Sequence, residues 1–185
     1  EGNYFIFFPS YSYMMDVYED YSSRYDDEIL LQDRFMDEKE TSKFLNKFNK
    51  DSSKTAFVVL GGIFSEGVDL VGERLIGAMV ISVGMPGVGF ERNLIKEHFD
   101  KAGLNGFDYS YTYPGINKVF QAAGRVIRSE NDRGIIYLLD DRFTSYKYRS
   151  LYPKHWKMKN IKIVNESKDF RKEISGFWET DSEKE

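Results

Sequence analysis

Short apolar runs alternate with helix-like patterns along this 185-residue chain, and that alternation limits the possible folds. Turn-forming residues bound five such runs, which predict strands at residues 4–8, 29–31, 56–60, 78–83 and 134–139. The runs are apolar almost throughout, as expected for strands whose two faces are both covered. The pattern therefore predicts an α/β fold, a three-layer domain with a mostly parallel central sheet flanked by helices.

Apolar residues recur at helical spacing between the predicted strands, within residues 11–21, 44–48 and 90–102. We expect these three stripes to form core against the sheet. A further helix is expected at residues 116–129, with Pro114 and Gly115 before it as breakers. Residues 103–115 are expected to form a long irregular connection.

Composition excludes several classes of protein. A hydrophobic fraction of 41% with 15 Phe and 13 Tyr excludes intrinsic disorder, and no apolar run is long enough for a membrane span. With no Cys and only two His, a disulfide framework, an iron–sulfur cluster or a metal-built active site is not expected in this chain. The start at Glu1 without a basic leader suggests an excised fragment of an intracellular, cytoplasmic protein. We expect one domain over residues 1–179 and a frayed polar tail at 180–185.

The net charge of −4 conceals a basic segment at residues 142–172, which carries ten Lys and Arg against two acidic residues. Aromatic residues are interleaved with this charge: Phe143, Tyr146, Tyr148, Tyr152 and Trp156. Phosphate neutralisation and base stacking on a single strand would use such a mixture. A solvated surface whose aromatic residues pack inward explains the same pattern.

The predicted helix at 116–129 carries the most informative side chains. At 100° per residue its apolar positions share one side, while Gln121, Arg125 and Arg128 cluster on the opposite face. Two guanidinium groups three residues apart can bind one anion, and arginine suits phosphate because its planar donors bind bidentately. The pattern predicts a phosphate clamp, with an ordinary basic helix face as the alternative.

The loop after the third predicted strand is rich in glycine and polar residues. Gly61, Gly62 and Gly67 allow a close backbone approach, and Ser65, Glu66 and Asp69 supply polar groups beside them. No Gly-Lys pair is present, so the chain has no Walker A phosphate loop, and no acidic box for magnesium is present either. The chain alone is not expected to bind and hydrolyse ATP by the usual route.

Three segments together resemble a known family. Residues 7–11 (FFPSY), 64–69 (FSEGVD) and 121–128 (QAAGRVIR) resemble motifs IV, V and VI of superfamily 2 helicases of the DinG/XPD type. The later residues Asp140 to Phe143 (DDRF) are also similar to this branch. The resemblance extends from Tyr4 to about Trp178. It implies the second, C-terminal RecA-like motor domain of an ATP-dependent DNA helicase.

The resemblance also implies roles for individual residues at an ATP site between two motor domains. Arg125 and Arg128 would contact the terminal phosphates, one of them as an arginine finger, and Gln121 would couple ATP to DNA. Further nucleotide-site positions are Glu66, Gly67, Asp69 and Gly124. ATP with Mg²⁺ would be bound mainly by the first motor domain, and an iron–sulfur cluster, where a relative has one, would lie outside this chain.

For DNA, the resemblance implies that Ser10, Tyr11 and Ser65 touch the backbone of a single strand without reading its sequence. The implied partners are single-stranded DNA and the first RecA-like domain of the same protein, at the bacterial nucleoid, without a membrane. The alternative is a non-catalytic nucleic-acid-binding or partner-docking module built on the basic segment. A stand-alone phosphate-ligand enzyme of flavodoxin-like shape is disfavoured, because no nucleophile and base form a candidate pair.

Overall fold

The computed structural model describes residues 2–65, 70, 74–127, 132–157 and 160–179. These residues belong to two compact units, residues 1–143 and residues 144–185. The first unit contains the sheet and carries the predicted motifs. Among the described helices of both units, none is long and apolar enough to cross a bilayer.

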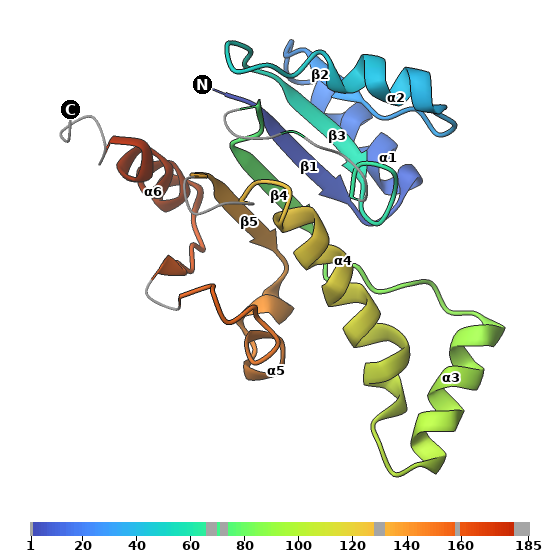
Figure 1. The fold of residues 1–185 in the computed structure, drawn as a ribbon. Helices are drawn as coiled ribbons and strands as arrows, with labels where there is room; N and C mark the ends of the chain where they lie inside the picture. The colour runs from blue at the N-terminus through green and yellow to red at the C-terminus, as the bar shows by residue number, and fades with distance from the viewer. Residues whose placement is uncertain (1, 66–69, 71–73, 128–131, 158–159, 180–185) are drawn as a thin grey trace. The chain divides into compact units, whose positions relative to one another are not determined.

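A five-stranded sheet with the order β2-β3-β1-β4-β5 forms the centre of the first unit (Figure 1). Its strands are β1 (Tyr4–Phe8), β2 (Ile29–Leu31), β3 (Thr55–Val59), β4 (Gly77–Ile81) and β5 (Ile135–Leu139). Every described pairing is parallel, with Phe5 of β1 opposite Ala56 on one side and Ala78 on the other. The predicted α/β fold is confirmed, and each predicted strand lies within one or two residues of an observed one.

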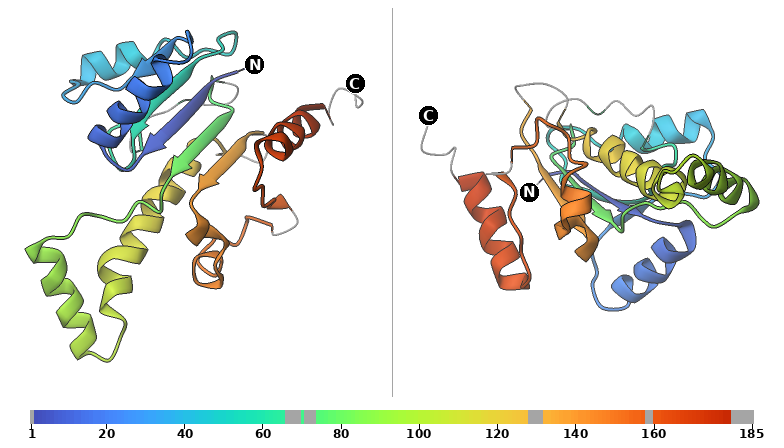
Figure 2. Two further views of the ribbon diagram at one scale, coloured as in Figure 1. Left: turned by 180° about the vertical axis from the view of Figure 1, so that it is seen from behind. Right: turned by 90° about the horizontal axis from the view of Figure 1, so that it is seen from below.

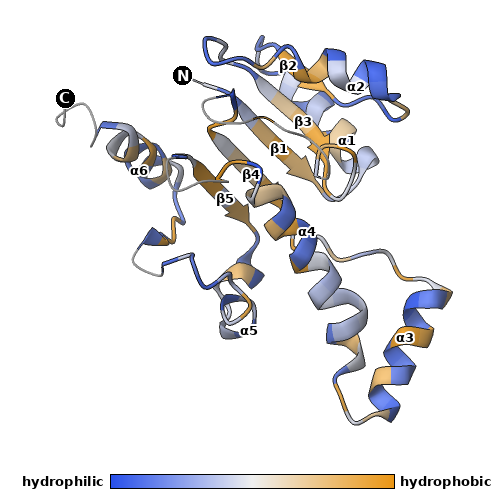
Figure 3. Ribbon diagram, viewed as in Figure 1, coloured by the Kyte–Doolittle hydropathy of each residue, from blue (hydrophilic) through white to orange (hydrophobic). Residues whose placement is uncertain are grey.

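Helices cover both faces of this sheet and complete three layers (Figure 2). On one face lies α1 (Tyr11–Ser22), whose Met14 is fully buried against Phe8 and Phe57. On the other face lie α2 (Glu38–Leu45) and α4 (Tyr113–Ala123). Phe44 of α2 and the following Phe48 pack there in contact with the rings of Phe64 and Phe5. Figure 3 shows the strands between the two helix layers as the most continuously apolar segments.

The segment between β4 and β5 forms a helical hairpin that extends beyond the sheet (Figure 1). Its first arm is α3 (Phe90–Lys101), and its second is the π-helix η2 (Asp108–Thr112), which continues into α4. No residue of α3 is buried, and Phe90 is 77% exposed. The expectation that residues 90–102 form core against the sheet is therefore wrong, as is that of an irregular connection up to residue 115.

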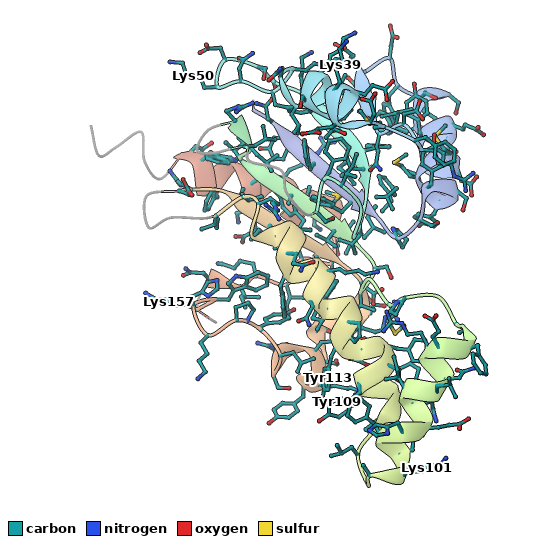
Figure 4. The ribbon with its side chains drawn as sticks, turned by 45° about the vertical axis from the view of Figure 1, so that its right-hand side comes forward. Lys39, Lys50, Lys101, Tyr109, Tyr113 and Lys157 are labelled. Carbon is teal, nitrogen blue, oxygen red and sulfur yellow. The ribbon has the colours of Figure 1, made fainter. Side chains whose placement is uncertain are left out.

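Aromatic stacking holds the two arms of this hairpin together. The rings of Phe99 and Tyr109 stack at a centroid distance of 4.0 Å, and Tyr109 meets Tyr113 edge to face at 5.2 Å. Figure 4 shows the side chains of Tyr109 and Tyr113 close together on the second arm. Phe99 of the α3 stripe thus packs on the second arm of the same hairpin instead of on the sheet, whereas Leu94 in the same stripe is 50% exposed.

The second unit contains α5 (Tyr146–Arg149) and α6 (Ser167–Glu179), and the 3-10 helix η3 (Asp141–Thr144) spans the boundary between the units. Of the aromatic residues in the basic segment, Phe143 and Tyr148 are buried, and the rings of Tyr152 and Trp156 pack edge to face. Tyr146 is 89% exposed. Most of these rings therefore pack inward, as in the solvated-surface alternative. The predicted tail at residues 180–185 lies outside the described residues.

Candidate functional site

Helix α4 brings the predicted motif VI residues against the face of the sheet. Near its start, a Cβ on Gly115 would lie 2.7 Å from the carbonyl oxygen of Val83, at the carboxyl end of β4. Just beyond its end, Val126 lies against Gly134, at the amino end of β5. The helix therefore runs antiparallel to the strands. The backbone after the helix thus lies towards the amino end of β5.

The helix ends earlier than its apolar pattern predicts. Its last residue is Ala123, and the next turn is tighter, with the N–H groups of Arg125 and Val126 donating to the carbonyls three residues before them. Gly124 stands at this end, where its low helix propensity favours termination. The expected helix over residues 116–129 is therefore wrong in extent, and Arg125 lies in a turn. Pro114 is also no breaker, because it lies in the first turn of α4, which proline tolerates.

The turn after α4 is tied to the loop after β3 through the guanidinium group of Arg125. Nε and Nη2 of Arg125 donate to the carbonyl oxygen of Ser65 at 3.1 and 2.9 Å. Ser65 is itself fixed, because its Oγ accepts from the N–H of Gly61 at 2.8 Å. The structure therefore brings together the predicted motif V and motif VI segments, which lie 60 residues apart in the sequence.

Gly61 is favoured at the start of this loop because its φ of +74° lies in the left-handed region that side chains disfavour. A Cβ there would lie 2.8 Å from Cδ of Lys118, whose flexible side chain could move aside. Lys118 on α4 thus lies across the loop. Its position along the helix places it three residues before Gln121, on the same side of α4.

The predicted nucleotide-site residues differ in how far the structure defines them. Gln121 and Gly124 are exposed, and Arg125 is half-buried. The remaining four, Glu66, Gly67, Asp69 and Arg128, lie outside the described residues. The described part of the site is therefore a solvent-accessible turn next to the buried residues Phe64 and Ser65 of the loop, with an arginine between them.

Of the three predicted DNA-contact residues, two lie at the start of α1 and one is buried. Ser10 is the N-cap of α1 and is exposed, with its Oγ accepting from the N–H of Tyr13 at 3.2 Å, and Tyr11 is the first residue of the helix. Ser65 is fully buried, and its hydroxyl is bonded to Gly61. The hydroxyl of Ser65 is thus already used inside the loop, and a contact of Ser65 with DNA stays a prediction.

Two polar contacts at the carboxyl edge of the sheet were not predicted from the sequence. The buried Gln32, directly after β2, accepts from the N–H of Val59 at 2.8 Å through Oε1. Arg142, after β5, donates from Nε and Nη2 to the two carboxylate oxygens of Asp140 at 2.8 and 2.6 Å. A polar residue immediately after an apolar run is the signal that could have indicated both.

The Asp140 carboxylate is held in its charged form. The hydrogen bond from Arg142 keeps the pKa of Asp140 below its usual value, against the opposing effect of partial burial. Nη2 of Arg142 also lies 3.3 Å from Oγ of Ser82, which has a φ of 71° just after β4. The pair therefore joins the carboxyl ends of β4 and β5. Within the described ranges, no group of three His, Cys, Asp or Glu side chains could hold a metal ion.

An all-parallel sheet between helix layers, with a motif VI arginine turn bonded to a motif V loop, defines a RecA-like α/β domain of the helicase class. A family model described as the helicase C-terminal domain matches residues 1–159. The chain belongs to this family, in its DinG/XPD branch.

Individual relatives agree with this assignment. The ATP-dependent DNA helicase YoaA of Haemophilus influenzae is 27% identical over 94% of this chain and 26% of its own length. The ATP-dependent DNA helicase DinG of Photobacterium profundum is 32% identical over 56% of this chain and 15% of its own length. A solved structure titled XPD helicase superposes with a TM-score of 0.62 at 20% identity, over 81% of this chain and 27% of that one, and shows the shared fold. The chain thus spans about a quarter or less of the length of the curated relatives it matches.

Proposed function

We propose that this chain is the second motor domain of an ATP-dependent DNA helicase and completes an ATP site whose other half lies on a first motor domain. The observation that carries the proposal is the arginine turn, in which Arg125 is held by the carbonyl oxygen of Ser65 beside the exposed Gln121 and Gly124. A fixed guanidinium group on a solvent-accessible turn suits an arginine that acts on a nucleotide across a domain interface. Residues 1–179 would be the extent of this domain.

At the nucleotide, Arg125 and Arg128 would contact the terminal phosphates, with Gln121 beside them. Glu66, Gly67, Asp69 and Gly124 would line the same site. Magnesium would be held mainly by the first motor domain, as the resemblance to DinG/XPD-type helicases implies. Arginine stabilises the charge that develops on the transferred phosphoryl group. ATP would close the two motor domains and hydrolysis would open them.

At the carboxyl edge of the sheet, Ser10 and Tyr11 would touch the backbone of single-stranded DNA. The exposed hydroxyl of Ser10 and the N–H groups at the start of α1 are donors of the kind that bind phosphate. Such contacts would hold any sequence equally. Relatives in bacteria favour a place in the cytoplasm, on nucleoid DNA.

The test is the DNA-stimulated ATPase of the intact protein with Arg125→Ala and Arg125→Lys. An arginine finger is worth roughly a thousand- to a hundred-thousand-fold in turnover, so we expect a loss of about a thousandfold or more with alanine. Lysine keeps the charge without the planar fork, and we expect it to restore little. Arg24→Ala is the matched control, because Arg24 forms an exposed ion pair with Asp20 on α1 and should leave turnover unchanged.

A loss of activity counts only if the variant still folds, since alanine also removes the two bonds to Ser65. A thermal unfolding transition close to that of the unsubstituted protein is the required check. Near-normal turnover in a folded Arg125→Ala variant would contradict the proposed role.

A further inference from the structure

The loop between β2 and α2 displays an aromatic ring that the fold does not use. Phe35 is 85% exposed, and within the described chain its ring contacts no other aromatic ring. Nothing in the packing of the first unit explains why a phenylalanine occupies this position. An exposed aromatic ring on a polar loop is a candidate for a binding role.

The loop that carries this ring is anchored on both sides of it. On one side, the buried Gln32 is bonded through its backbone to Phe57 and through its side chain to Val59. Next to the ring, the N–H of Phe35 donates to Oδ1 of Asp33 at 3.3 Å. On the other side, Asp37 begins α2 with a reciprocal capping box to Glu40. The exposure of Phe35 is therefore a property of an anchored loop.

The groups that surround the loop have a common chemistry. The guanidinium carbon of Arg34 lies 5.4 Å from the centroid of the Tyr11 ring, so the loop lies against the start of α1. There Oγ of Ser10 and Oγ of Ser12 lie 3.3 Å apart at an exposed position. One edge of the domain thus carries a free aromatic face, a guanidinium group and two hydroxyls.

This combination matches a nucleotide better than it matches a peptide or a free phosphate. The flat face of a base stacks on an aromatic side chain, and guanidinium and hydroxyl groups bond the neighbouring phosphodiester. Asp33 and Asp37 accept from backbone N–H groups of their own loop but keep their negative charge. Stacking, rather than net charge, would therefore dominate the interaction.

We propose that Phe35 is a base-stacking platform for single-stranded DNA, with Arg34, Ser10 and Ser12 contacting the adjoining backbone. The inference rests on the proposed function, and it extends the DNA track from the start of α1 to the β2–α2 loop. Stacking on an aromatic ring tolerates every base, so the platform adds affinity without sequence preference.

The test uses the intact protein with Phe35→Ala and Phe35→Trp, and with the same two substitutions at Phe90 as controls, because Phe90 is a similarly exposed ring on α3. We expect Phe35→Ala to weaken binding of oligothymidylate roughly 5- to 100-fold while the salt dependence stays the same. Tryptophan at position 35 should preserve binding, and its emission should be quenched by the oligonucleotide. Neither substitution at Phe90 should produce these effects.

An oligonucleotide with abasic sites provides the second comparison. Because it keeps the phosphates but lacks the bases, we expect it to bind the unsubstituted protein and Phe35→Ala equally. Unchanged affinity of Phe35→Ala for oligothymidylate would overturn the platform. A change in the tryptophan emission of Phe35→Trp on addition of an ATP analogue without DNA would also overturn the platform. Such a change would show that protein covers the ring.

The outcomes separate this inference from the function on which it rests. If DNA-stimulated ATPase requires Arg125 but DNA binding is the same with and without Phe35, the proposed function holds and the stacking platform does not. A protein with neither DNA-stimulated ATPase nor single-strand binding loses both proposals.

Discussion

At the scale of single residues, the ion pair of Asp140 and Arg142 holds the chain in place at the carboxyl edge of the sheet. Asp140 and Arg142 are two residues apart, and their pairing includes the backbone N–H of Arg142, which donates to Oδ1 of Asp140 at 3.0 Å. The side chain of Asp140 is mostly shielded from solvent, whereas that of Arg142 is partly exposed. The pair therefore fixes the chain directly after β5 at a modest cost in desolvation.

Asp140→Asn should show how much this pair stabilises the domain. The pKa of Asp140 is lower in the folded state than in the unfolded state, so its contribution is present at neutral pH and is lost as the pH falls through the folded pKa. We expect asparagine to lower the free energy of unfolding by about 0.5 to 1 kcal/mol at pH 7. The difference from the unsubstituted protein should shrink below about pH 4.

Urea unfolding at a series of pH values measures the loss of stability and its pH dependence, and Asp20→Asn on the exposed pair with Arg24 is the control. A difference that stays constant down to pH 3 would show that the charge is not responsible.

At the scale of elements, the sequence predicts strands better than it predicts the partners of helices. The five strands were recognisable because each is apolar on both faces. The stripe of α3 was recognisable too, but an amphipathic pattern does not say whether a sheet or another helix covers it. The end of α4 was missed because the apolar pattern continues through Val126 and Ile127, although Gly124 marks the position where the helix ends.

The hairpin should behave as a separately stabilised element. Because α3 has no buried residue and packs on η2 through the stack of Phe99 on Tyr109, we expect Phe99→Ala to loosen residues 90–112 without unfolding the sheet. The lost stack is worth about 0.5 to 1.5 kcal/mol. Hydrogen exchange should accelerate in the hairpin alone, while the urea midpoint of the sheet stays the same. Leu94→Ala, at an exposed position of α3, is the matched control. Equal acceleration in the hairpin and the strands would show that the two unfold together.

At the scale of the whole molecule, the sequence indicates which residues form the candidate site but only partly how they are arranged. The motif residues Gln121 and Arg125 were identifiable because a paired arginine pattern has a clear phosphate chemistry. The burial of Ser65 was not, because the sequence does not show which polar group closes a glycine-rich loop on itself. In the proposed function, the exposed turn after α4 would be one wall of the ATP site, and the second wall would belong to another domain.

An ATP analogue should therefore protect a defined part of this chain in the intact protein. If nucleotide closes the two motor domains, hydrogen exchange should slow at residues 121–125 and 61–65, which are joined by the bonds from Arg125 to Ser65. The last turn of α1, at residues 19–22, is the internal control and should not change. Arg125→Ala should abolish the protection. Protection that persists in that variant would place the nucleotide contact on other residues.

The π-helix η2 and helix α4 form one continuous helical segment from Asp108 in the projecting hairpin to Ala123 beside the arginine turn. At Gly115 this segment passes closely over the backbone of Val83 and Met85. A π-helical turn followed by proline and glycine is where helices bend most readily, so a load on the hairpin would be taken up at this joint. The hairpin could then move while the end of the segment that is proposed to bind phosphate stays in place.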